Sequence, residues 1–148
     1  MNNATFFFNQ PKNEPVFSYA KGSKERELLS KELEKQYNQC IEIPIIINGK
    51  EIRTGNVSEV VMPTEHSHVL AKFHKADKET VQKAIEAALE ARKKWENVHW
   101  IDRCSIMLRA AELLAGKYRY VINAATMLGQ GKNPFQAEID SACETIDF

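Results

Sequence analysis

The pair Asn48-Gly49 constrains the fold of this chain more than any other short feature, because it stands inside the stretch IPIIINGKEIRTG. Asn and Gly both tolerate the positive φ angles of a type I′ turn, so the pair predicts a tight β-hairpin over residues 43–54. Pro44 has no N–H to donate to a neighbouring strand, so its strand is expected to begin there or to lie at a sheet edge. The first half of the chain is therefore expected to contain β-structure.

A second hairpin is predicted directly after the first. Residues 57–62 and 69–75 read as extended segments, and the sequence PTEH at residues 63–66 reads as the turn between them. Val69, Ala71 and Phe73 fall on alternate positions, which is the period of a strand.

From Asp77 onward the period becomes helical. Asp77 is suited to cap a helix whose repeating face consists of Val81, Ala84, Ile85, Ala88, Arg92 and Trp95. A second helix is expected from about residue 101 to 116, and a third, carrying residues 121–128, is expected to end at Gly129 in a left-handed conformation. Asn133-Pro134 then opens a fourth helix, with a buried stripe of Ile139, Ala142, Cys143 and Ile146.

The N-terminal part carries weaker signals. Residues 1–22 hold Pro11 and Pro15 among polar residues and show little periodicity, so they are expected to form an extended arm. Ser23 is expected to cap a helix with a thin leucine stripe, which favours an arm and helix docked on other parts of the protein. The chain is thus predicted to be α+β, with an arm, a helix, two hairpins and about four further helices.

Composition excludes several classes of protein. Lys plus Arg and Asp plus Glu each count 20, so the net charge is zero and gives no reason to expect nucleic acid or a membrane as a partner. No apolar stretch approaches the ~18 residues of a membrane span. The N-terminus resembles neither a signal peptide nor a transit peptide, and three scattered cysteines fit a reducing compartment. We therefore expect a soluble cytoplasmic protein.

The stretch Gly129-Gln130-Gly131-Lys132 invites comparison with phosphate-binding loops. A P-loop requires glycine where this chain has Thr126, and Ser or Thr where it has Asn133. The dinucleotide fingerprint follows a strand, whereas a helix is expected to precede these glycines. The stretch is therefore interpreted as a connector between two helices.

Other candidate chemistry is sparse. The three histidines at positions 66, 68 and 74 are compatible with a metal, but no cysteine or carboxylate stands beside them at a recognised spacing, and we predict no metal site. Cys104 and Cys143 are expected to be buried core thiols, and Cys40 a strand-edge residue. Glu138 and Asp140 are two apart on a helix and cannot pair as acid and base. The residues alone therefore give no catalytic constellation.

Five stretches, however, resemble the aldehyde dehydrogenase superfamily and, within it, the 1-pyrroline-5-carboxylate dehydrogenase family. They are NEPVFSYAKGSKER (13–26), IPIIINGKEIRTG (43–55), ADKETVQKAIEAALEARKKWE (76–96), DRCSIMLRAAELLAGKYR (102–119) and MLGQGKNPFQAEIDSACETIDF (127–148). The first and last are specific to that family, and the others are shared across the superfamily. The resemblance implies an α/β aldehyde dehydrogenase fold, with residues 23–148 as an incomplete N-terminal part of its NAD-binding domain.

Members of that family oxidise glutamate semialdehyde, the open form of pyrroline carboxylate, to glutamate with NAD during proline degradation. The resemblance implies a cysteine nucleophile, a glutamate base and a nucleotide-binding loop, all downstream of this sequence, so none of Cys40, Cys104 and Cys143 inherits the nucleophile's role. It also implies a small-molecule substrate and a homo-oligomer for the complete enzyme. The chain by itself is expected to be an inactive fragment, with Phe148 as a truncation point.

One residue carries over from the family as a candidate site. The glutamate of the QAEID motif, here Glu138, would line the aldehyde entrance, and a solvated helix glutamate without function is the equal alternative. The different class of function left open is an autonomous, non-catalytic binding or regulatory module derived from the same fold.

Overall fold

The computed structural model describes residue 7 and residues 10–148. The rest of the arm expected over residues 1–22, namely residues 1–6 and 8–9, lies outside the described residues. The elements in chain order are α1 (Lys24–Tyr37), β1 (Ile41–Ile43), β2 (Ile45–Ile47), β3 (Lys50–Ile52), β4 (Val57–Met62), β5 (Glu65–His74), α2 (Lys78–Trp95), α3 (Trp100–Ala115), α4 (Arg119–Gln130), α5 (Pro134–Ala137), the π-helical segment η1 (Glu138–Cys143) and α6 (Glu144–Asp147).

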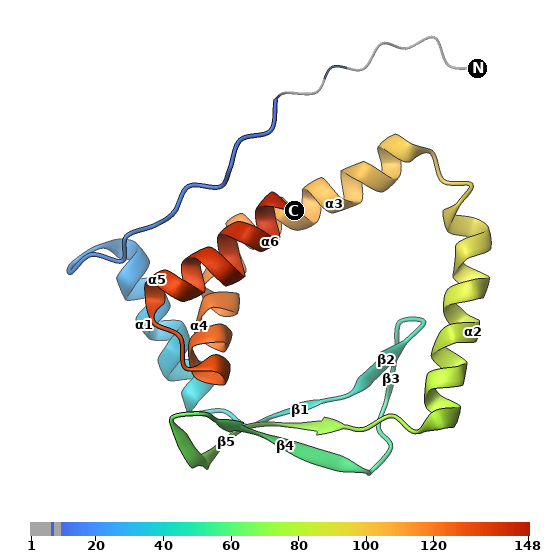
Figure 1. Ribbon diagram of the computed structural model, residues 1–148, viewed down its shortest axis with the longest axis horizontal. Helices are drawn as coiled ribbons and strands as arrows, with labels where there is room; N and C mark the ends of the chain where they lie inside the picture. The colour runs from blue at the N-terminus through green and yellow to red at the C-terminus, as the bar shows by residue number, and fades with distance from the viewer. Residues whose placement is uncertain (1–6, 8–9) are drawn as a thin grey trace.

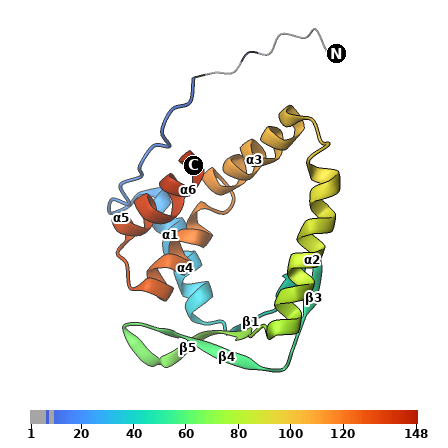
Figure 2. The ribbon, with the colours of Figure 1, turned by 45° about the vertical axis from the view of Figure 1, so that its right-hand side comes forward.

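These elements follow one another around an open frame (Figures 1 and 2). The strands form one side, α2 extends away from the sheet as the second side, and α3 lies opposite the sheet. The fourth side is formed by α1 and α4, which lie side by side, and by the run from α5 to α6. The side chain of Gln36 links α1 to α4 by donating to the backbone oxygen of Val121 at 3.0 Å.

The first predicted hairpin is confirmed. Strands β2 and β3 pair in antiparallel fashion, and their turn residues Asn48 and Gly49 have φ angles of 51° and 73°. Pro44 lies between β1 and β2 and belongs to neither, as a residue without an N–H should.

The second hairpin differs from the prediction in its turn. Strand β5 begins at Glu65, which pairs with Met62, so Pro63 and Thr64 alone make the turn. Two shifts of register beside Val61 allow the ladder to reach that far, and the expected four-residue turn was wrong. The pattern also gave no sign that β1 pairs with β5 in parallel, which places β5 at the centre of the sheet β1-β5-β4.

The predicted helix starts are confirmed at three caps. The side chain of Ser23 accepts from the N–H of Arg26 at 3.2 Å, and that of Asp77 from Thr80 at 2.8 Å. Asn133 forms a capping box with Gln136, and Pro134 follows as the first helical residue. These caps satisfy N–H groups that a helix start leaves unpaired.

The predicted end of α4 was wrong by two residues. The helix continues through Gly129 to Gln130, and Gly131 is the residue with a positive φ, of 68°. The N–H of Gly131 donates to the backbone oxygen of Met127 at 3.0 Å, which closes the helix. Both Gly129 and Gly131 fit the sequence pattern of a helix end. The bond from Gly131 to Met127 shows that the helix ends at Gly131.

A small core joins the arm to two helices. Tyr19, Leu29 and Ala124 are buried together, and Phe17, Leu33, Tyr120 and Met127 pack around them. The arm is therefore docked on the body of the protein from about residue 14 onward, with Tyr19 in a left-handed backbone conformation of φ 50°. For a bulky residue this conformation costs on the order of 1–3 kcal/mol, so its surroundings must hold it.

By contrast, α2 and α3 expose much of their apolar surface. Val81, Ile85 and Leu89 lie one turn apart on α2 and are each about half exposed. On α3, Cys104 is exposed together with Ile106 and Met107, so the prediction of a core thiol at residue 104 was wrong. Cys143 is buried as expected.

Candidate functional site: a buried cluster around Glu138

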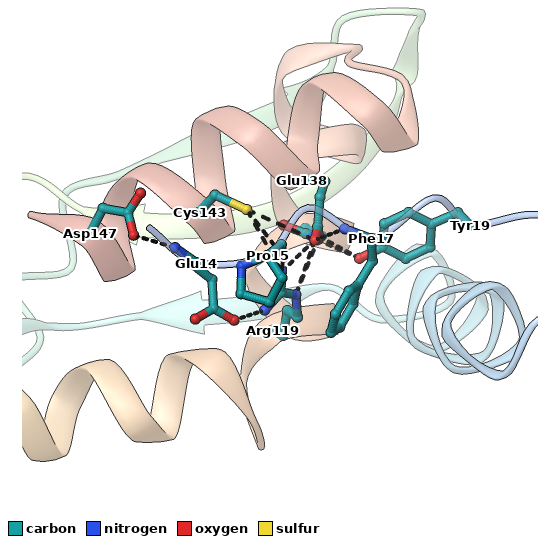
Figure 3. A network of polar contacts seen from close by, with 9 residues as sticks. Glu14, Pro15, Phe17, Tyr19, Arg119, Glu138, Cys143 and Asp147 are labelled. Carbon is teal, nitrogen blue, oxygen red and sulfur yellow. Dashed lines mark hydrogen bonds and ion pairs between the residues drawn. The ribbon is translucent and has the colours of Figure 1, made fainter. Parts of the chain in front are cut away.

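Glu138, the candidate residue, begins η1 and has an exposed fraction of 0%. Its carboxylate accepts from the Tyr19 hydroxyl at 2.6 Å and from the Phe17 N–H at 2.8 Å. It also accepts from the amide nitrogen of Asn123 at 2.8 Å. Figure 3 shows Phe17 and Tyr19 of the arm beside the carboxylate. Glu138 is therefore not solvated, and the alternative of a solvated helix glutamate was wrong.

Arg119, the first residue of α4, is the buried counter-charge of Glu138. Its side chain is 1% exposed and forms ion pairs with Glu138 and with Glu14 of the arm. It also donates to the backbone oxygen of Pro15 at 2.7 Å, and its guanidinium lies 3.8 Å from the centre of the Phe17 ring. A buried charge is tolerated only when paired and hydrogen-bonded, and Arg119 meets both conditions.

The cluster also includes Asn123 and Cys143. The amide nitrogen of Asn123 donates to the Tyr19 hydroxyl at 2.9 Å as well as to Glu138, which fixes which end of the amide faces the carboxylate. Its oxygen is buried without a partner among the described residues. The Cys143 sulfur lies 3.7 Å from a guanidinium nitrogen of Arg119, so the last residue of η1 touches the same arginine as the first.

The protonation states follow from this arrangement. Burial raises the pKa of Glu138, but hydrogen bonds from Arg119, Tyr19, Phe17 and Asn123 outweigh burial and hold that pKa below its ordinary value. Burial alone would lower the pKa of Arg119, but Glu138 and Glu14 raise it above its ordinary value. Burial and the bond to Glu138 raise the pKa of Tyr19. The cluster therefore holds ionised Glu138 and Arg119 beside a neutral phenol.

The thiol of Cys143 is not set up as a nucleophile. Burial, and then the nearby carboxylate of Glu138, raise its pKa above the ordinary value. A reactive cysteine needs a lowered pKa and access to solvent, and the buried Cys143 has neither. That none of Cys40, Cys104 and Cys143 is the nucleophile stays a prediction.

The predicted helix connector is confirmed from Gly131 onward, whereas Gly129 and Gln130 still belong to α4. It joins the end of α4 to α5, and Lys132 donates to Asp140 of η1 at 2.5 Å. Its lysine is thus engaged by a carboxylate of the chain itself.

Two of the three histidines, His68 and His74, make separate contacts. His68 stacks on the Tyr37 ring at 4.0 Å, whereas His74 accepts from the N–H of Gly55 and lies 2.7 Å from an oxygen of Glu42. In the part of the chain that the structure describes, no three His, Cys, Asp or Glu residues are grouped to hold a metal ion. None of its helices, within those same residues, combines the length and apolarity that crossing a bilayer requires.

Sequence reasoning singled out Glu138 but missed its partners. Arg119 and Asn123 stand four residues apart on a largely apolar helix, so they share one face, and this spacing was the available signal. Tyr19 and Phe17 gave no signal, because an arm without periodicity does not show which face it buries. No described residue marks where a substrate enters, so the entrance role of Glu138 stays a prediction.

Known proteins resemble both the sequence and the fold. Residues 51–148 match the sequence profile described as "Aldehyde dehydrogenase family". The delta-1-pyrroline-5-carboxylate dehydrogenase of Agaricus bisporus is 50% identical over 146 residues, which cover 98% of this chain and 27% of that relative. The mitochondrial enzyme of that name from Homo sapiens is 47% identical over 136 residues, which cover 92% of this chain and 24% of that relative.

Solved structures give the same result. The delta-pyrroline-5-carboxylate dehydrogenase from Mycobacterium tuberculosis, bound with NAD and cobalamin, matches with a TM-score of 0.95 and 40% identity. That match covers 99% of this chain and 28% of the other. A 1-pyrroline-5-carboxylate dehydrogenase from Thermus with bound NAD matches with a TM-score of 0.87 and 26% identity. That match covers 96% of this chain and 27% of the other. The chain thus spans about a quarter of the length of the relatives it matches.

Proposed function

Because the chain belongs to the aldehyde dehydrogenase family, we propose that it forms part of an NAD-dependent enzyme that oxidises glutamate semialdehyde, the open form of 1-pyrroline-5-carboxylate, to glutamate. The observation that carries the proposal is the 50% identity to the Agaricus bisporus enzyme along almost the whole chain. The proposed role lies in proline degradation, with a small molecule as substrate and a homo-oligomer as the complete assembly.

The glycine stretch of residues 129–132 does not itself fit NAD. Gly129 lies within α4, Gly131 follows the helix, and Lys132 pairs with Asp140, so this stretch offers no free phosphate cradle. NAD, when bound, accepts the hydride that the aldehyde loses. What the described residues contribute is the scaffold: they hold a buried carboxylate, exclude water from it and tie the arm to α4 and η1.

The assignment of Glu138 to the substrate entrance is part of this proposal. In support, Glu138 opens a π-helical segment, and such segments are frequent at functional sites. Because the carboxylate is buried, we propose that it acts through the shape of η1 rather than through an open, solvated carboxylate.

The test is a chimera that joins residues 1–148 to the remaining sequence of the Agaricus bisporus relative. The chimera is expected to reduce NAD with pyrroline carboxylate, whereas the 148-residue chain alone is expected to show no turnover. A folded chimera without turnover would contradict the proposed reaction. Turnover by the 148-residue chain would contradict its role as one part of the enzyme.

We also propose a cytoplasmic location. The three scattered cysteines, which fit a reducing compartment, support it, while the Homo sapiens and Dictyostelium discoideum relatives are named mitochondrial. Cell fractionation of the natural protein decides the matter, and recovery in mitochondria would overturn the proposal.

A further inference from the structure

Arg119 contacts both ends of η1 and the arm at the same time. One face of its guanidinium lies on the Phe17 ring, and its nitrogens reach Glu14, Pro15 and Glu138. We propose that Arg119 is a positioning residue: it fixes the segment of residues 14–19, called the anchor segment below, and η1 against α4, and so sets the geometry beside the proposed substrate entrance. The kinetic consequence rests on the proposed function, whereas the structural one does not.

The shape of the contacts made by Arg119 suits this role. An arginine side chain offers five donor N–H groups in one rigid plane, and a single residue can therefore hold several acceptors in a fixed arrangement. Here the acceptors lie on both sides of Arg119 in the chain: Pro15 and Glu14 lie 104 and 105 residues before it, and Glu138 lies 19 residues after it. Removing Arg119 releases the anchor segment and η1 together.

The segment η1 also depends on its contacts with Arg119. A π-helical turn is rare and less favourable than an α-helical one, so its neighbours must hold it. Arg119 pairs with Glu138, the first residue of η1, and lies 3.7 Å from the sulfur of Cys143, the last residue. The guanidinium thus spans the whole irregular segment.

The anchor segment depends on the same cluster. Tyr19 has a positive φ and donates its hydroxyl to Glu138, and the N–H of Phe17 donates to the same carboxylate. If Glu138 shifts, both bonds are lost and the strained backbone of Tyr19 is free to relax. The position of Glu138 is fixed in turn by Arg119.

The experiment compares Arg119→Gln with Arg109→Gln in the chimera described above. Arg109 is an exposed arginine of α3 that pairs with Glu112, so it controls for the loss of one positive charge. Hydrogen exchange is measured by mass spectrometry on peptides that cover residues 14–19 and 138–143. Arg119→Gln is expected to speed exchange in both peptides by about tenfold or more, and Arg109→Gln in neither.

Kinetics separate positioning from general damage. Arg119→Gln is expected to raise KM for pyrroline carboxylate by about tenfold with KM for NAD unchanged, because a small displacement near a substrate is costly. Arg119→Lys keeps the charge but loses the planar guanidinium. Its KM for pyrroline carboxylate is expected to lie between those of Arg119→Gln and the unchanged protein. Equal changes in the two KM values would overturn the positioning role.

A milder variant keeps the test decisive if Arg119→Gln does not fold. Glu14→Gln weakens one ion pair at the partly exposed rim and leaves the Arg119–Glu138 pair in place. It is expected to speed exchange in residues 14–19 while 138–143 stay protected. Unchanged exchange in residues 14–19 would overturn the inference. If the unmodified chimera lacks turnover, the proposed function fails, and exchange alone still decides whether Arg119 holds the two segments.

Discussion

At the scale of single residues, the chain devotes its most buried polar groups to one cluster. Arg119, Asn123 and Glu138 are the largest side chains with essentially no exposed surface. Their hydrogen bonds reach Tyr19 and the arm. Polar groups buried to this degree are costly unless every partner is in place, so this cluster is where single substitutions should matter most.

Glu138→Ala is expected to lower the opening free energy of α1 and α4 by about 3–5 kcal/mol, because it leaves the charge of Arg119 buried without its main partner. The measurement is hydrogen exchange of the amides in these two helices. Glu112→Ala, which breaks the exposed pair with Arg109, is the control and is expected to cost less than about 1 kcal/mol. If the two substitutions lowered the opening free energy by similar amounts, the buried pair would contribute no more to stability than the exposed one.

The lowered pKa of Glu138 predicts a pH dependence with a definite sign. The folded-state pKa lies below the unfolded-state value of about 4.3, so the carboxylate's contribution to stability is present above that value. It is lost as the pH falls through the lower, folded-state pKa. The opening free energy of α1 and α4, measured by hydrogen exchange, is therefore expected to fall more between pH 6 and pH 3 in the unchanged chain than in Glu138→Gln. Parallel pH profiles of the two proteins would contradict this.

At the scale of elements, local chemistry explains the ends of helices and strands well. The caps at Ser23, Asp77 and Asn133 and the turn at Asn48-Gly49 depend on neighbouring residues alone, so the sequence predicted them. The parallel pairing of β1 with β5 and the irregular winding of η1 depend on distant contacts. These could not be predicted from local patterns.

The two glycines near the end of α4 provide a matched pair of substitutions. Gly131→Ala is expected to destabilise α4 by roughly 1 kcal/mol, because a Cβ atom disfavours the φ of 68°. Gly129→Ala adds a Cβ to a helical position with open space around it and is expected to stabilise the helix by up to about 1 kcal/mol. Thermal unfolding followed by circular dichroism shows whether each substitution stabilises or destabilises the protein. If Gly131→Ala stabilised it and Gly129→Ala destabilised it, the helix would instead end at Gly129.

At the scale of the whole molecule, apolar surface is unevenly covered. The side formed by α1, α4 and η1 has a core, whereas α2 and α3 expose Val81, Ile85, Leu89 and Ile106 among others. Fully burying one large aliphatic side chain contributes roughly 1.5–3 kcal/mol, against a net stability of about 5–15 kcal/mol for a domain. The part of the frame formed by α2 and α3 is thus expected to be the less stable one.

The 148-residue chain is therefore expected to self-associate and to unfold in more than one step. Urea unfolding followed by circular dichroism reports all helices, whereas tryptophan fluorescence reports Trp95 and Trp100, which end α2 and begin α3. The fluorescence transition is expected at lower urea. Replacing Ile85 and Leu89 by Glu is expected to reduce association. A monomer with one coincident, cooperative transition would favour the autonomous module instead.

The long sequence separation inside the buried cluster has a consequence for biosynthesis. Tyr19 precedes its hydrogen-bond partner Glu138 by 119 residues. At translation rates of about 5–20 residues per second, the nascent arm leaves the ribosome on the order of ten seconds before its binding surface has been made. During that time Phe17 and Tyr19 are accessible to chaperones and proteases, and their burial is complete only after α4 and Glu138 have been made. Slowing translation between codons 19 and 138 therefore lengthens the period in which the newborn chain is most vulnerable.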